Sequence, residues 1–193
     1  MKEYSAREIR YTTDSDVLAE VLRRDDDIYN DAFLSLYAVE NPNCPSEALV
    51  EVLRRGKNDE ISGMAAFNLN CPPEVLVEVL RRGENNDVSY YAAANPRCPS
   101  EALVEVLRRE KLDMVSQSAA ENPNCPPEIL SEILRKGRDD EVSYSAAMNI
   151  NCPYKERFEW LERMGKLTKY DPEKFELEHN EEDKDLEELR KLM

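Results

Sequence analysis

The stretch "NPNCPSEALVEVLRR", Asn41 to Arg55, decides the fold because nearly the same string returns along the chain. The further copies begin at Asn68, Asn95, Asn122 and, in a diverged form, Asn149. Each copy holds one Cys-Pro pair, and the five cysteines of the chain follow one another at intervals of 27 residues. A fixed period of this length is typical of solenoids, in which each repeat packs only on its neighbours.

The first half of each repeat is predicted to be a helix. Proline suits the first helical position, so Pro45 would place Cys44 at the N-cap and Glu47 at the third helical position, in the manner of a capping box. Leu49 and Leu53 then share one apolar face, and Gly56 ends the helix. An upstream copy, "TDSDVLAEVLRR", aligns a threonine with the cysteines. The predicted cap residues are Thr13, Cys44, Cys71, Cys98, Cys125 and Cys152.

The second half of each repeat is predicted to be a shorter helix, as in "DDEVSYSAAM". An acidic residue opens it, which suits a helix N-terminus, and paired alanines near its end allow neighbouring helices to approach closely. An Asn, followed by Pro in three of the five copies, ends it. Each repeat therefore reads as helix, turn, shorter helix, turn, and the chain is predicted to be an all-α solenoid of 27-residue helix-turn-helix repeats.

Four segments are expected along the chain. Residues 1–40 form an N-terminal capping repeat with a four-residue insertion in "DDDIYNDAFL", and residues 41–148 form four regular repeats. Residues 149–165 form a C-terminal capping helix, in which Arg157 replaces an apolar residue of the other copies. Residues 166–193 form a charged, acidic C-terminal extension.

The string "VSYYAAANPRCPSEALVEVL" resembles the leucine-rich repeat variant family and, more loosely, HEAT and armadillo arrays. The matching positions are Val88, Ala92, Asn95, Pro96, Pro99, Leu103 and Val106 or Leu107. The resemblance covers about residues 13–163 and implies a right-handed helical superhelix. Three features depart from the family pattern: a longer period, Ser in place of the usual Arg after the Val, and Cys in place of the usual Thr. A known member carries an iron–sulfur domain, but the clustered cysteines of that domain are missing here, so its function does not transfer.

The composition narrows the class of protein. The net charge of −15 disfavours binding to nucleic acids and anionic membranes, because proteins bind these surfaces largely through Lys and Arg. The same charge favours a basic partner. No apolar run reaches the length of a membrane span, and the start of the chain lacks a secretory pattern. We therefore expect a soluble, cytoplasmic protein; its oligomeric state is left open.

Enzymatic chemistry is not predicted. Disulfides are disfavoured because neighbouring repeats pack about 9–10 Å apart, whereas a disulfide needs Cα atoms about 5.5 Å apart. A ladder of cysteines does not converge on a metal, and the single histidine, His179, lies in the C-terminal extension. Rows of Glu, Arg and Ser repeat without a base for a catalytic triad. We expect no cofactor and no metal, and small buried cysteines that fill contacts between repeats.

Recognition is expected where the repeats differ. Positions that recur unchanged hold the fold, whereas the varying positions of the second helix are free to contact a partner on the concave surface. The candidate partner-binding residues are Tyr37, Met64, Phe67, Tyr90, Tyr91, Gln117, Tyr144 and Met148. The leading hypothesis is a non-enzymatic scaffold that binds a protein or peptide. The alternatives are an acidic nucleic-acid mimic, a thiol-based redox or metal protein, and a designed array without a natural partner.

Overall fold

The computed structural model describes residues 3–24 and 31–167 of the chain, and every regular element in these residues is an α-helix. Each repeat contributes a first helix and a second helix. The first helices are α2 (Ser15–Arg23), α4 (Ser46–Arg54), α6 (Pro73–Arg81), α8 (Ser100–Leu107), α10 (Pro127–Arg135) and α12 (Tyr154–Arg163). The second helices are α3 (Asp31–Glu40), α5 (Glu60–Phe67), α7 (Asp87–Ala94), α9 (Met114–Glu121) and α11 (Glu141–Met148). A short helix, α1 (Ala6–Tyr11), precedes them.

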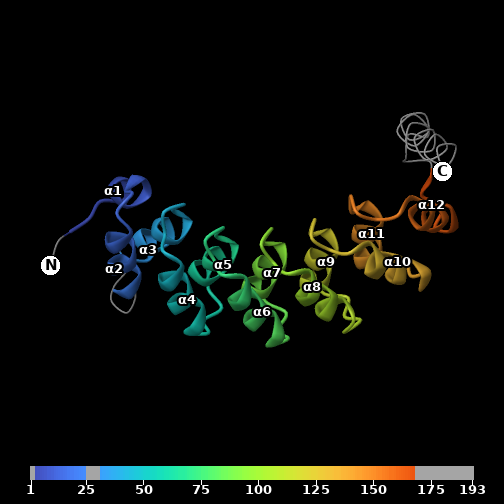
Figure 1. Ribbon diagram of the computed structural model, residues 1–193, viewed down its shortest axis with the longest axis horizontal. Helices are drawn as coiled ribbons and strands as arrows, with labels where there is room; N and C mark the ends of the chain where they lie inside the picture. The colour runs from blue at the N-terminus through green and yellow to red at the C-terminus, as the bar shows by residue number, and fades with distance from the viewer. Residues whose placement is uncertain (1–2, 25–30, 168–193) are drawn as a thin grey trace, which may run out of the picture.

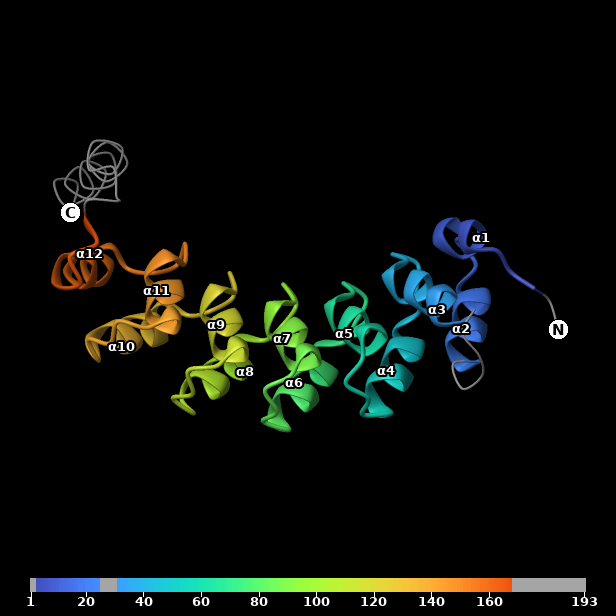
Figure 2. The same ribbon diagram turned by 180° about the vertical axis from the view of Figure 1, so that it is seen from behind.

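The helices stack in chain order into a curved row, which confirms the predicted all-α solenoid (Figure 1). Each second helix packs on the next second helix, and more closely than successive first helices pack on each other. The row therefore bends towards its second helices, which line the concave side, while the first helices lie on the convex side (Figures 1 and 2). The right-handed sense that the resemblance implies stays a prediction.

Small side chains allow this close packing. In α7, Ala92 and Ala93 are fully buried, and Ser89 is almost fully buried. The same positions are Ala65, Ala66 and Ser62 in α5, so two second helices meet through their smallest side chains. The first helices instead meet through a row of fully buried leucines, whose larger volume holds them further apart. This row comprises Leu18, Leu49, Leu76, Leu103 and Leu130.

The predicted caps of the first helices are wrong by one residue. The N-cap of α4 is Pro45, in an extended conformation with φ −71° and ψ 141°, and no side chain caps this helix. Cys44 lies one position earlier, where its side chain is fully buried between repeats and so does not reach the helix N–H groups. In α2 the N-cap is Asp14, whose carboxylate accepts hydrogen bonds from the Asp16 and Val17 amides, and Thr13 only precedes it. The other predicted caps, Cys71, Cys98, Cys125 and Cys152, are likewise buried and followed by a proline N-cap.

Side chains cap four of the second helices, α5, α7, α9 and α11. The Asp59 carboxylate accepts a 2.8 Å hydrogen bond from the Ser62 amide at the start of α5. Asn86, Asp113 and Asp140 make the same bond in α7, α9 and α11. In each of these helices the backbone N–H of the recurring Ser donates the hydrogen bond to the capping side chain. The row of serines therefore has a structural role.

A row of buried asparagines joins neighbouring repeats, which the sequence reading had treated only as helix stops. The Asn95 side-chain amide donates hydrogen bonds to the carbonyl oxygens of Ala66 (2.7 Å) and Asn68 (3.1 Å) in the preceding repeat. Its side-chain oxygen accepts a bond from the Arg97 amide at 2.8 Å. Asn122 and Asn149 repeat this pattern, so each asparagine donates to a carbonyl in the last turn of the previous second helix and to the carbonyl of the residue that ends that helix.

Different groups complete the hydrogen bonds at the two ends of this asparagine row. At the N-terminal end, Asn41 donates to the carbonyls of Ile9 and Thr12, so α1 stands where a preceding second helix would lie. At the C-terminal end, Arg157 donates to the carbonyls of Asn149 and Cys152 at 2.6 and 3.3 Å. In the inner repeats these carbonyls accept from the next asparagines along the chain. Arg157 thus caps the row, as its exchange for an apolar residue predicts.

A glycine with a left-handed backbone ends several first helices, as predicted for Gly56 (φ 69°), and the others are Gly83 (φ 71°), Gly137 (φ 67°) and Gly165 (φ 65°). The equivalent residue after α8 is Glu110, which adopts φ 55° although it carries a side chain. Its carboxylate accepts hydrogen bonds of 3.1 Å from both Lys136 and Arg138 of the next repeat. These bonds lower the pKa of the Glu110 carboxyl, the bond from Lys136 having the largest effect.

The helices can be placed within the predicted segments. Residues 41–148 contain the four regular repeats, and α12 lies within residues 149–165. Residues 25–30 of the stretch "DDDIYNDAFL", where the insertion is predicted, and residues 168–193 of the predicted extension lie outside the described residues.

Candidate functional site: the concave face

The concave face is formed by the exposed side of the five second helices. In α7 the residues of the helix that are not buried are Asp87, Tyr90, Tyr91 and Ala94, at the spacing of one side of a helix, and Tyr91 also packs partly against the core. The equivalent residues of the other second helices differ from repeat to repeat. All eight predicted partner-binding residues lie on this face because they occupy the last three of these four positions.

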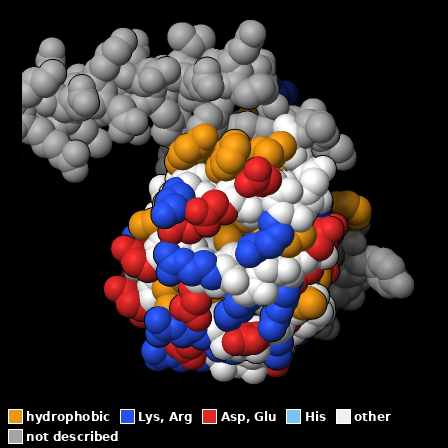
Figure 3. All heavy atoms as spheres, turned by 90° about the vertical axis from the view of Figure 1, so that its right-hand side faces the viewer, with side chains coloured by type: hydrophobic (Ala, Val, Ile, Leu, Met, Phe, Trp, Pro, Cys, Tyr) orange, Lys and Arg blue, Asp and Glu red, His pale blue; other side chains and the backbone are white. Residues whose placement is uncertain are grey.

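Charge is divided between the two sides of the row. The second helices contain no Lys or Arg, whereas they contain six acidic residues: Asp31, Glu40, Glu60, Asp87, Glu121 and Glu141. The basic residues of the regular repeats lie in the first helices and in the turns. Seen from the C-terminal end, side chains of both charges mix over the lower, convex side, and hydrophobic side chains gather at the upper edge (Figure 3).

Three of the predicted residues meet at the middle of the concave face. The ring centroids of Tyr90 and Tyr91 lie 5.3 Å apart in an edge-on arrangement, and those of Phe67 and Tyr91 lie 5.8 Å apart. Phe67 is exposed and the two tyrosines are half-buried. We refer to Phe67, Tyr90 and Tyr91 as the central aromatic cluster. Gly63 makes room for it, because a Cβ atom there would lie 2.9 Å from Cδ2 of Tyr91.

Two other tyrosines of the concave face lie at its ends, apart from the central aromatic cluster, and each is covered by a cation of the chain itself. The guanidinium carbon of Arg10, from α1, lies 4.9 Å from the ring centroid of Tyr37. The Lys166 ammonium, just after α12, lies 5.7 Å from the ring centroid of Tyr144 and 5.0 Å from that of Trp160. Lys166 also forms an ion pair with Asp139. The sequence reading missed both cations, because they lie outside the second helices.

The remaining predicted residues occupy different surroundings. Met64 packs partly against the core, and Gln117 donates a 3.1 Å hydrogen bond to the carboxylate of Glu121 on the same helix. Met148 is exposed and lines a groove of about 370 Å³ together with Tyr144, Leu161 and Lys166. The structure thus brings together the three central aromatic residues and, separately, the pair Tyr144 and Met148.

The cysteines are placed for packing. All five thiols are free and buried. Burial raises the pKa of Cys44, Cys71, Cys98 and Cys125 to about 12, and it raises the pKa of Cys152 as well. A thiol with so high a pKa carries almost no thiolate at neutral pH, and the thiolate is the form that attacks electrophiles and binds metals. In residues 3–24 and 31–167 no group of His, Cys, Asp and Glu is arranged to hold a metal ion.

The Glu and Arg rows of the first helices pair across repeats, as their alternating charges predict. Arg54 and Glu78 lie 3.8 Å apart, and Arg81 and Glu105 lie 3.2 Å apart. A second row of arginines at the ends of the first helices has a further structural role, in which Arg109 donates to the Leu80 carbonyl at 2.9 Å and Arg163 to the Leu134 carbonyl at 2.7 Å. Much of the charge on the convex side therefore serves contacts between repeats.

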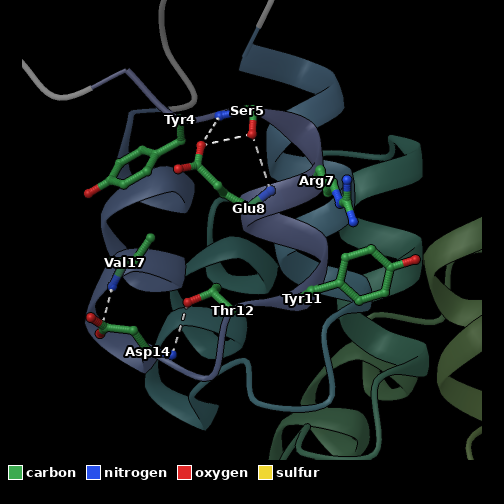
Figure 4. Close-up of a pocket in the computed structure, with 8 residues that line it drawn as sticks. All are labelled: Tyr4, Ser5, Arg7, Glu8, Tyr11, Thr12, Asp14 and Val17. Carbon is green, nitrogen blue, oxygen red and sulfur yellow. Dashed lines mark hydrogen bonds between the residues drawn. The ribbon is translucent and has the colours of Figure 1, made fainter.

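A further hollow, of about 600 Å³, lies beside α1 at the N-terminal end. Its polar side chains bond to one another: Glu8 accepts from both the amide and the hydroxyl of Ser5 at 2.8 Å, and Thr12 accepts from the Asp14 amide at 3.1 Å (Figure 4). These bonds cap α1 and order the turn before α2. The hollow is consequently a by-product of helix capping.

Comparison of the chain with protein-family models, with curated proteins and with solved structures found no match. The likeness to the leucine-rich repeat variant family therefore rests on the repeat pattern alone. In the part of the chain that the structure describes, no helix is long and apolar enough to cross a membrane.

Proposed function

We propose that the protein is a non-enzymatic interaction module whose concave face binds a segment of another protein. The observation that carries this proposal is the central aromatic cluster, in which three of the varying side chains meet on an accessible surface. Tyrosine and phenylalanine supply large contact areas at interfaces for a small loss of side-chain entropy. The positions that recur in every repeat are used by the fold, which leaves the varying ones for recognition.

The alternatives receive less support. A nucleic-acid mimic needs an unbroken row of carboxylates, whereas the carboxylates of the first helices are interleaved with arginines that pair with them. A thiol-based redox role needs an accessible thiolate, and the cysteines are buried with raised pKa values. Neither alternative accounts for the aromatic side chains on the concave face.

The proposal can be tested by affinity capture from the lysate of the host cell. The full chain is compared with a Tyr90→Ala/Tyr91→Ala variant and with Phe158→Ala, which removes an exposed ring on α12 outside the concave face. Circular dichroism establishes that all three are folded. We expect a partner that the parent and Phe158→Ala retain and the double variant loses. Retention of the same proteins by all three folded chains would contradict the proposal.

A further inference from the structure

The second helices, which form the concave face, carry aromatic rings and carboxylates but no Lys or Arg of their own. Asp87 precedes Tyr90 and Tyr91 by three and four residues on α7, so its exposed carboxylate lies on the same side of that helix. Glu60 has the same relation to Met64 on α5. Electrostatic complementarity with such a surface favours a partner segment that carries positive charge.

Two cations of the chain itself already lie over tyrosine rings of the concave face. At one end Arg10 lies over Tyr37, and at the other Lys166 lies near the rings of Tyr144 and Trp160 while pairing with Asp139. Both cations come from segments that flank the regular repeats. They lie within about 6 Å of the ring centroids, the distance at which the ring quadrupole attracts a cation.

The central aromatic cluster is the counterpart of these two sites in the middle of the row. Tyr37 belongs to the first repeat, Tyr90 and Tyr91 to the third, and Tyr144 to the fifth. Among the described side chains, no Lys or Arg lies over the ring of Phe67, Tyr90 or Tyr91. Tyr91 thus occupies the same helix position as Tyr37, and Tyr90 the same position as Tyr144, without the cation that covers each outer ring.

We propose that the central aromatic cluster binds an arginine side chain of the partner segment. Because the rings of Tyr90 and Tyr91 stand at 75° to each other, the guanidinium would stack on the face of one ring, beside the other ring, and pair with the carboxylate of Asp87. Arginine fits better than lysine because its planar group stacks on aromatic faces and is more weakly hydrated than an ammonium. This inference rests on the proposed function and specifies the chemistry of the partner.

The test uses a peptide in which three arginines are separated by Gly-Ser spacers, and the same peptide with citrulline in place of arginine. Citrulline keeps the shape of the side chain and removes its charge. Dissociation constants are measured by calorimetry at about 0.15 M salt, where long-range attraction to the acidic chain is screened. We expect the citrulline peptide to bind at least about tenfold more weakly, since a desolvated cation–π contact and an ion pair are both lost.

Matched variants separate a site on the concave face from general attraction to a chain of charge −15. Tyr91→Leu is compared with Phe158→Leu, and Asp87→Asn with Glu101→Gln, an exposed carboxylate on α8. We expect Tyr91→Leu and Asp87→Asn each to weaken the arginine peptide about fivefold or more, and the two controls to leave it unchanged. Equal effects of Asp87→Asn and Glu101→Gln, with none from Tyr91→Leu, would overturn the inference.

A selection from a random dodecapeptide library on the full chain distinguishes failure of the inference from failure of the proposed function. Enriched peptides that contain arginine and lose binding to Tyr91→Leu support both. Enriched peptides that lack arginine but depend on Tyr91 overturn the inference and leave the proposed function standing. Failure to enrich any peptide that depends on Tyr91 counts against both.

Discussion

The side-chain amide of Asn95 donates a 2.7 Å hydrogen bond to the carbonyl oxygen of Ala66, 29 residues earlier in the chain. Asn95 is fully buried, and it closes the last turn of α5 from the neighbouring repeat. The stability of each repeat is therefore linked to the next by a polar contact as well as by the leucine row. A buried polar link also fixes the register of stacking, because a shifted repeat would leave the amide and the carbonyl unpaired.

Asn95→Leu should lower the free energy of unfolding by about 3 kcal/mol, because it leaves the Ala66 carbonyl and the Arg97 amide without their partner and removes one of the two hydrogen bonds to the Asn68 carbonyl. Urea denaturation followed by circular dichroism measures the change. Asn85→Leu, at an exposed position of the turn before α7, serves as the control and should change the stability by less than about 0.5 kcal/mol. A loss for Asn95→Leu no larger than that of the control would contradict the linking role of the asparagine row.

Glu110→Gly should raise the melting temperature by roughly 2–4 °C, because glycine adopts the left-handed backbone of this position without the Cβ clash. The lost ion pairs with Lys136 and Arg138 are exposed and offset only part of this gain. The reverse change, Gly56→Ala, tests the backbone alone, since nothing lies within 4 Å of a Cβ built there. Differential scanning calorimetry should show the two substitutions moving the transition in opposite directions; a lower melting temperature for Glu110→Gly would mean that the ion pairs dominate.

The native thiols should be inert. With a thiol pKa of about 12, Cys98 carries a thiolate fraction of roughly 10⁻⁴ at pH 8. Ellman's reagent should therefore react slowly with the folded chain and titrate all five thiols once the chain is unfolded in urea. A Glu101→Cys variant, exposed on α8, provides the rate of an accessible thiol in the same fold. Native cysteines that react at the rate of this control would restore the thiol-based alternative.

Gly63→Ala should weaken binding without a large loss of stability. The new methyl group would displace the Tyr91 ring, which lies 2.9 Å from the Cβ position, while alanine favours the helix by about 1 kcal/mol. We expect the arginine peptide to bind several-fold more weakly and the free energy of unfolding to stay within about 1 kcal/mol of the parent. In a Tyr91→Leu background, Gly63→Ala should no longer change the affinity. Parent-like affinity for Gly63→Ala alone would show that the ring position does not matter.

The periodicity of the sequence was sufficient to predict the fold, whereas the contacts between repeats were not predictable in the same way. The spacing of Leu49 and Leu53, the helix-ending Gly56 and the paired alanines each report on the local backbone, and the structure confirms all of them. The hydrogen bonds of the asparagine row join residues that are 27 to 29 positions apart in the chain. The local sequence pattern therefore predicted only that each asparagine ends a helix. The prediction that Cys44 caps the helix was wrong because Pro45, rather than Cys44, is the N-cap residue. The side chain of Cys44 is buried in the core and makes no capping hydrogen bond.

For the candidate site, the varying positions of the second helices all lie on the concave face, but the sequence did not show which of these side chains meet. The sequence could not show that Phe67 and Tyr91, from different repeats, bring their rings within 5.8 Å. Nor could it show that Arg10 and Lys166 fold back over Tyr37 and Tyr144, since each cation lies more than twenty residues away along the chain. The capping box of α1, Ser5 with Glu8, was a local signal that could have predicted this helix.

Site-specific photo-cross-linking in the host cell tests the binding role of the concave face most directly. A benzophenone amino acid replaces either Gln117, on α9 in the concave face, or Glu101, on α8 at the convex side. The cross-linked products are identified by mass spectrometry. Position 117 should capture a discrete partner through a segment that contains arginine, and position 101 should capture none. Capture of the same protein from position 101 with none from position 117 would contradict binding through the concave face.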